Sequence, residues 1–205
     1  MSRIVAFVVF AALAVAGCGS TGYNLPPPSA APAGSMASPM PTPSVTSYRI
    51  HLVQDRGQVT GTVTGPCHLR DHGQLPDRSC TPGAYDPTMT AAVLCSPGYR
   101  TSTYRPPSSQ TTKFKYEVAE PAYGQDHVSG ELDHLISLEL GGSNDASNLW
   151  AEAGPVPNPK DAVENALHRW VCSAAWPQAQ ARLHDAQTAI AINWAAAEQK
   201  LGIAG

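Results

Sequence analysis

Hydrophobic and polar residues follow three patterns along the chain. Ile4 to Ala16 is an unbroken apolar run, too short to span a membrane comfortably. From Ser20 to about Ser47 the chain is mostly Pro, Ser, Ala, Thr and Gly. Such a segment cannot bury enough apolar surface to fold, and its prolines keep it extended. Residues 48–205 carry strand and helix periodicities, and we expect this part to form a folded domain.

Alternation in residues 48–118 predicts strands and loops. Tyr48 to Thr64 alternates around an Asp55-Arg56-Gly57 turn, which predicts a β-hairpin. Residues 65–90 are rich in Gly and Pro and predict a long loop. Thr88 to Cys95 is a short apolar segment, either a strand or a helix turn, and Thr111 to Val118 reads as a strand.

Two helices are predicted in the C-terminal part. Asn158-Pro159 supplies a side-chain cap and a proline for the first turn of a helix. Residues at helical spacing then form an apolar stripe, namely Val163, Ala166, Leu167, Trp170 and Val171. Pro177 starts a second helix with Leu183 and Trp194 on its apolar face. The predicted fold class is α+β, with a β- and loop-rich N-terminal part and two C-terminal helices.

The first seventeen residues have the features of an export signal. Arg3 gives a positive start, and the apolar run ends with small residues directly before Cys18. This order resembles the lipobox of bacterial lipoproteins, which implies cleavage before Cys18 and a diacylglyceryl thioether on its sulfur. An ordinary secretory signal with a chance cysteine is the alternative. We predict a signal peptide over 1–17, a lipidated Cys18 with its linker over 18–47, and anchoring to the outer face of the bacterial cell membrane.

Four further cysteines lie in the predicted domain: Cys67, Cys80, Cys95 and Cys172. Because export leads to oxidising surroundings, this even count predicts two disulfides. A zinc site is the weaker alternative, since no CxxC spacing occurs. Of the three pairings that four cysteines allow, we predict a local Cys67–Cys80 bridge and a Cys95–Cys172 bridge that ties the N-terminal part to the C-terminal helices.

The net charge argues against tight, non-specific binding to nucleic acid. Removing Arg3 from the 13 basic residues leaves 12 against 16 acidic ones, so the mature chain carries a net charge of about −4. Nucleic-acid-binding proteins usually present a basic face. A bound divalent cation would offset part of the negative charge.

Residues 131–150, ELDHLISLELGGSNDASNLW, concentrate the groups that phosphodiester hydrolysis needs. A neutral histidine, here His134, can activate water near neutral pH. A divalent metal on Asp133 would stabilise the phosphate and the leaving oxygen. The Gly141-Gly142 turn brings the chain back, so that the Asn148 amide could fix the loop that carries His134. An Asp-His pair on the surface and an ordinary turn asparagine are the structural alternatives.

The helix that begins near 158 would complete the metal site. Its candidate oxygen ligands are Asn158 itself, or Asp161 and Asn165, which are four residues apart and share a face. Asp161 could instead serve only as a helix N-terminal charge. Carboxylates and water suit Mg²⁺, with Mn²⁺ as the alternative. Lys160 would contact the phosphate of the substrate.

The order of these motifs resembles the HNH nucleases, whose fold is the ββα-metal (His-Me) finger. The wider pattern is similar to a set of exported bacterial HNH-type proteins over about residues 80–194. The shared motifs are CTPGAYDP (80–87), TMTAAVLCSPGY (88–99), RPP (105–107), YG (123–124), ELDHLISLELGG (131–142), NLW (148–150), KDAVENALHRWVC (160–172) and AQTAIAINW (186–194). The resemblance implies a ββα-metal core at about 128–172.

The resemblance also implies roles for three residues. His134 would be the general base, Asp133 a metal ligand, and Asn148 the residue that orients the His134 loop. The third ligand of typical HNH sites, an Asn or His on the helix, has no unambiguous match, so the three helix candidates stay open. The chain departs from the set at Ser137 and around Glu152, where prolines are usual.

Two functions follow from this pattern. The first is an exported, metal-dependent HNH-type nuclease that hydrolyses nucleic acid, with DNA favoured over RNA as the substrate. The second is a catalytically inactive surface lipoprotein that uses the same scaffold for binding or structure. The sequence indicates no protein partner.

Overall fold

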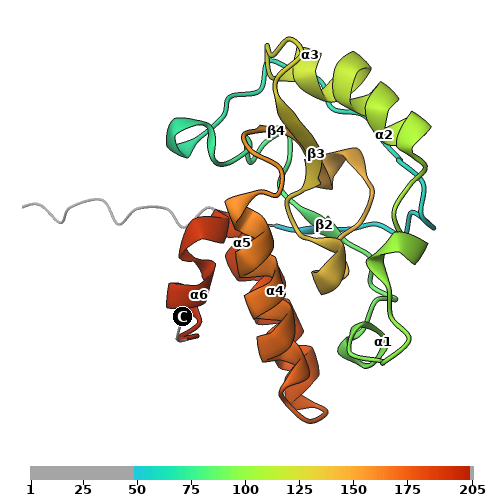
Figure 1. Cartoon of the computed structure of the whole chain (residues 1–205), viewed down its shortest axis with the longest axis vertical. Helices are drawn as coiled ribbons and strands as arrows, with labels where there is room; N and C mark the ends of the chain where they lie inside the picture. The colour runs from blue at the N-terminus through green and yellow to red at the C-terminus, as the bar shows by residue number, and fades with distance from the viewer. Residues whose placement is uncertain (1–48, 204–205) are drawn as a thin grey trace, which may run out of the picture. The chain divides into compact units, whose positions relative to one another are not determined.

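The computed structural model describes residues 49–203, which all belong to one compact unit (Figure 1). The predicted signal peptide, the lipidated Cys18 and the linker lie outside the described residues. Within the described part of the chain, no helix is long and apolar enough to cross a membrane. The fold is α+β, as predicted, with small sheets and several helices.

Two two-stranded sheets form among residues 49–203. In the first, β1 pairs with β2 in parallel, and in the second, β3 pairs with β4 antiparallel. The strands are β1 (His51–Leu52), β2 (Ala84–Tyr85), β3 (Gly130–His134) and β4 (Leu149–Ala153). The α-helices are α1 (Ala91–Leu94), α2 (Ser108–Phe114), α3 (Glu120–Ala122), α4 (Pro159–Cys172), α5 (Gln178–Asn193) and α6 (Ala197–Lys200). A π-helical turn, Lys115–Ala119, joins α2 to α3.

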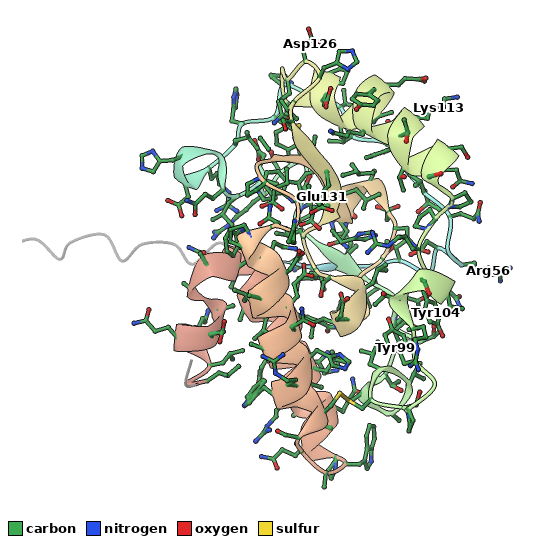
Figure 2. All side chains as sticks on the ribbon, in the orientation of Figure 1. Arg56, Tyr99, Tyr104, Lys113, Asp126 and Glu131 are labelled. Atoms are coloured by element: carbon green, nitrogen blue, oxygen red, sulfur yellow. A yellow bond between two sulfur atoms is a disulfide. The ribbon has the colours of Figure 1, made fainter. Side chains whose placement is uncertain are left out.

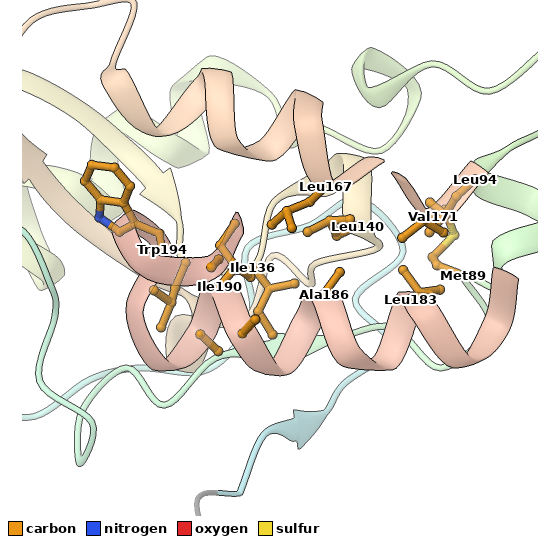
Figure 3. Packing of buried hydrophobic residues seen from close by; sticks show 14 of the residues in the cluster. Met89, Leu94, Ile136, Leu140, Leu167, Val171, Leu183, Ala186, Ile190 and Trp194 are labelled. Carbon is orange, nitrogen blue, oxygen red and sulfur yellow. The ribbon is translucent and has the colours of Figure 1, made fainter. Parts of the chain in front are cut away.

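The main core lies between α4 and α5 (Figure 3). Leu167 and Val171 of α4 are four residues apart and fully buried, and Leu183 and Ile190 of α5 face them. Ile136, from the loop after β3, fills the same cluster. Burying each such side chain contributes about 1.5–3 kcal/mol. The core therefore anchors the loop that follows His134 to the two helices.

Both predicted disulfides are confirmed. Cys67 and Cys80 are bridged with a Cα–Cα distance of 6.1 Å, and Cys95 and Cys172 with one of 5.3 Å. The second bridge joins the end of α1 to the last residue of α4. It spans 77 residues of sequence and constrains the unfolded chain accordingly.

The predicted hairpin at 48–64 is wrong. β1 pairs with β2, and Thr60 forms a bridge with Asp145. The Asp55 turn itself does form, because the Asp55 carboxylate accepts a hydrogen bond from the Gly57 N–H at 2.7 Å. Local alternation identified extended segments and a turn, but their pairing partners lie far away in sequence.

The strand predicted at Thr111–Val118 is also wrong, since this segment belongs to α2 and the π-helical turn. Phe114 and Ala119 are buried on one side, and Lys115 is held by the carbonyls of Val128 and Gly130 at 3.0 and 2.9 Å. These tertiary contacts favour a helix over the alternating pattern. The segment 88–95 contains the short helix α1, one of the two alternatives. The helices predicted after Asn158 and Pro177 are confirmed as α4 and α5.

Candidate functional site

The β3–β4 hairpin places Asp133 and His134 on opposite faces of the sheet. Asp133 is opposite Trp150 in the antiparallel register, and His134 is opposite Leu149. His134 is the last residue of β3, and the next residue, Leu135, donates to the Asn148 carbonyl at 2.8 Å. The regular alternation of a strand therefore continues to the end of β3. Each of the two side chains meets a different set of neighbours.

His134 is buried and is held through one ring nitrogen. Its Nε2 is 2.8 Å from Oδ1 of Asn144, and only 4% of the residue is exposed. Burial lowers the pKa of His134 below its ordinary value, and nearby Arg105 and Lys160 act in the same direction, while the bond to Asn144 and the charge of Asp133 oppose them. The imidazole is therefore neutral at pH 7, which is the form that can accept a proton.

A groove opens beside His134, between β3 and α2. This β3–α2 groove has a volume of about 470 Å³. Among the residues that line it are Arg105, Ser108, Thr111, Tyr116, Glu131 and His134. Figure 2 marks Glu131 on β3. Arg105 is exposed and supplies a positive charge to the groove, and the serine and threonine hydroxyls are further hydrogen-bonding groups for a phosphate.

On the opposite face, Asp133 belongs to a buried ionic cluster. The Lys160 ammonium lies 2.7 Å from Asp133 Oδ2, contacts Glu164 Oε1, and donates to the His134 carbonyl at 2.7 Å. Lys160 is 1% exposed. Burial lowers the pKa of Lys160, but the Asp133 and Glu164 carboxylates raise it by more, so the ammonium stays charged. The predicted phosphate contact by Lys160 does not match this buried position.

A third carboxylate, Glu152 on β4, adjoins this cluster. It is 3% exposed, and burial together with the charge of Asp133 raises its pKa to about 9. Burial also raises the pKa of Asp133, but Lys160 lowers it by more, so Asp133 stays ionised. Burial raises the pKa of Glu164, which Lys160 opposes. One ammonium thus faces three carboxylates, and a proton on Glu152 relieves part of the excess negative charge.

The three helix candidates for metal binding are engaged in the start of α4. Asn158 accepts from the Lys160 N–H at 2.9 Å, and Asp161 accepts from the Asn158 N–H at 3.1 Å, which completes a capping box. Asn165 is exposed and donates to the Asp161 carbonyl at 2.7 Å. None of them is bonded to Asp133. No group of three or more His, Cys, Asp or Glu side chains in the described part could hold a metal ion.

A divalent ion is better matched by Asp133 together with Glu152. Glu152 Oε2 is buried without a hydrogen-bond donor, whereas Asp133 Oδ2 is paired with the Lys160 ammonium at 2.7 Å. Mg²⁺ keeps several waters and takes one or two protein carboxylates. A buried carboxyl oxygen of Glu152 beside an excess of carboxylates over ammonium groups fits such an ion. The candidate metal ligands therefore lie on β3 and β4 and not on α4.

Asn148 makes the contacts of a loop brace. It is fully buried, and its amide N–H₂ donates to the carbonyls of Ile136 and Ser143 at 2.9 and 2.8 Å. Its Oδ1 accepts from the N–H groups of Ile136 at 2.9 Å and Ala84 at 3.2 Å. All four bonds go to backbone, so one side chain fixes the loop after His134 at both ends and joins it to β2.

Comparisons with protein-family models, with curated proteins and with solved structures found no match. Several residues of the site were missed at the level of sequence: Asp55, Arg105, Asn144, Glu152 and Glu164. Weak signals for some of them exist. Lys160 and Glu164 have the i,i+4 spacing of a helical ion pair, and Arg105 stands in the RPP motif.

Proposed function

We propose that this chain is an exported, metal-dependent endonuclease of the HNH type, with β3, β4 and α4 as its ββα-metal core. One observation carries the proposal: His134 ends β3 with one ring nitrogen held by Asn144 and lines a groove that also contains Arg105. A neutral, oriented imidazole beside a cation is what activation of water against a phosphodiester requires.

In the proposed reaction, His134 takes a proton from water through the ring nitrogen that Asn144 does not hold. The water oxygen forms a bond to phosphorus, and the bond from phosphorus to the leaving oxygen breaks. Arg105 binds the non-bridging oxygens of the phosphate. Asp133 and Glu152 would hold the divalent ion, Mg²⁺ or Mn²⁺, on the other face of β3, where it would offset the excess negative charge beside the site.

The location of this activity is part of the proposal. Two disulfides indicate an exported protein. Lipidation of Cys18 would hold the domain at the outer face of the cell membrane, where its substrate would be DNA from outside the cell.

A plasmid-nicking assay tests the proposal. We expect the purified protein to convert supercoiled plasmid to nicked and linear forms with Mg²⁺ or Mn²⁺, and to lose this activity in EDTA. His134→Ala should lower the rate by about 10²–10⁴-fold, the usual contribution of a general base. Absence of cleavage with every divalent ion, or equal cleavage by His134→Ala, would overturn it.

A catalytically inactive module is the second candidate. It is favoured by the buried Asp133–Lys160 ion pair, which gives Asp133 a partner without any metal, and by the negative net charge of the chain. Calorimetric titration with Mn²⁺ discriminates the two functions. Binding that is lost in Asp133→Ala supports the nuclease, and absence of binding supports the inactive module.

A further inference from the structure

The loop segment that contains Asp55 reaches His134 through one intermediate, Asn144. Asn144 is 1% exposed and Asp55 is 7% exposed, so this contact is shielded from water. Asp55 Oδ2 accepts from the Asn144 backbone N–H at 2.6 Å, and Asp55 Oδ1 accepts from the Asn144 side-chain Nδ2 at 2.7 Å. Both carboxylate oxygens of Asp55 therefore accept hydrogen bonds from the same residue, Asn144.

These bonds determine which way the Asn144 amide points. Its Nδ2 donates to Asp55 Oδ1 and to the Tyr104 carbonyl at 2.9 Å. Both partners are acceptors, and a carboxylate or a carbonyl cannot donate to an amide oxygen. Rotating the amide by 180° would place Oδ1 against two acceptors. The oxygen must therefore face His134.

The orientation of the amide in turn fixes the proton on the imidazole. An amide oxygen accepts only, so the His134 nitrogen 2.8 Å away, Nε2, must carry hydrogen and donate. In the neutral ring, Nδ1 then holds the lone pair. Among the described residues Nδ1 has no hydrogen-bond partner, which leaves it free to accept a proton from a water molecule.

We propose that Asp55 and Asn144 are positioning residues that hold His134 in the Nε2–H tautomer. The catalytic consequence rests on the proposed nuclease function, but the tautomer itself does not. Asp55 is 79 residues from His134 in sequence and lies outside the β3–β4–α4 unit. The N-terminal segment would therefore be part of the site. Since Asn144 also bonds the Tyr104 carbonyl, the same asparagine fixes the backbone beside Arg105.

Nitrogen-15 NMR of histidine-labelled protein tests the tautomer directly. In the wild-type protein without metal, at a pH where His134 is neutral, we expect Nε2 to have the shift of a protonated nitrogen and Nδ1 that of an unprotonated one. The opposite assignment, or an even mixture of the two tautomers, overturns the proposal without any variant having to fold.

Variants then test Asp55. Asp55→Asn offers one acceptor and one donor where two acceptors stood, so it cannot hold both Asn144 groups. We expect mixed tautomers at His134 and, if the protein is a nuclease, a kcat lowered by about 10- to 100-fold with KM nearly unchanged. Asp77→Asn is the matched control, because Asp77 also accepts from two backbone N–H groups, of His68 and Ser79, but has no bond to the site.

Two outcomes separate the positioning role of Asp55 from the proposed nuclease function. If Asp55→Asn keeps the wild-type tautomer, Asp55 is not a positioning residue. Wild-type protein that shows the Nε2–H tautomer but cleaves no DNA would refute the nuclease and leave the positioning role standing.

Discussion

The two faces of β3 carry buried polar networks of different kinds. On the His134 face, donors and acceptors match: each group of the Asp55–Asn144–His134 chain meets its complement. On the Asp133 face, Lys160 pairs with Asp133 and Glu164, and the nearby Glu152 has a buried oxygen without a donor. A network in which every donor meets an acceptor fixes the geometry of its side chains. A network with too many carboxylates destabilises the folded state until a cation binds or a carboxylate takes up a proton. The difference suggests that one face orients a base and the other receives an ion.

Removing the Lys160 ammonium should break the network on the Asp133 face most severely. Lys160→Met leaves Asp133 and Glu164 without their cation and frees the His134 carbonyl. We expect the free energy of unfolding at pH 7 to fall by about 3 kcal/mol, with a smaller loss at pH 5, where carboxylates take up protons more readily. Urea unfolding followed by tryptophan fluorescence measures both values.

Lys113→Met is the control for this substitution. The Lys113 side chain is 72% exposed, and its ion pair with Glu117 spans 3.9 Å. Such a change should alter stability by less than about 0.5 kcal/mol. Equal effects of the two substitutions would mean that the buried cluster contributes no more than a surface pair.

After His134 itself, Arg105 is the groove residue whose loss should lower activity without loss of folding. Arg105→Ala removes the cation of the β3–α2 groove and should lower kcat/KM for plasmid cleavage by about 10- to 100-fold. Arg105→Lys keeps the charge but not the two-pronged donor geometry, so its activity should be intermediate. Arg100→Ala is the control, because Arg100 is exposed and bonds only nearby carbonyls. An Arg105→Ala variant as active as this control would show that the β3–α2 groove takes no part in the reaction.

The parts of this site that sequence could predict are those with local causes. The cap and proline at Asn158-Pro159 specify where α4 begins, and the structure has a capping box there. Asn148 follows a Gly-Gly turn and braces the loop as expected from that position. The predicted Cys67–Cys80 and Cys95–Cys172 bridges are also present, but four cysteines allow three pairings and the sequence alone does not decide among them.

The parts that sequence could not predict depend on contacts between distant segments. Asp55 and Asn144 are 89 residues apart, and no periodicity connects them. Lys160 has the sequence context of an exposed first-turn residue, yet packing places its ammonium under β3, where it bonds the His134 carbonyl. The helix candidates for metal binding looked available because a cap and a ligand use the same oxygen chemistry.

Metal binding distinguishes the hairpin carboxylates from the helix residues. Glu152→Gln keeps the shape of the side chain but removes a charged ligand, and we expect it to weaken Mn²⁺ binding by about tenfold in calorimetry. Asn165→Ala should leave the affinity unchanged, because Asn165 is exposed and bonds only the α4 backbone. The reverse result would restore the helix as the source of the ligand and leave Glu152 as a structural acid.

The last effect, a change in the slope of stability with pH, concerns the proton that Glu152 holds in the metal-free protein. Since its pKa is raised to about 9 from 4.5, the folded state keeps a proton that the unfolded state releases over this interval. Stability from this group is therefore fully present below about pH 4.5 and is lost as pH rises towards 9. In EDTA, the free energy of unfolding of the wild-type protein should fall more steeply between pH 5 and 9 than that of Glu152→Gln. The difference should reach at most about 1.4 kcal/mol per pH unit, the value for one proton. Glu117→Gln, which changes an exposed side chain, is the control. Parallel curves of unfolding free energy against pH for wild type and Glu152→Gln would show that the Asp133 face carries no excess negative charge.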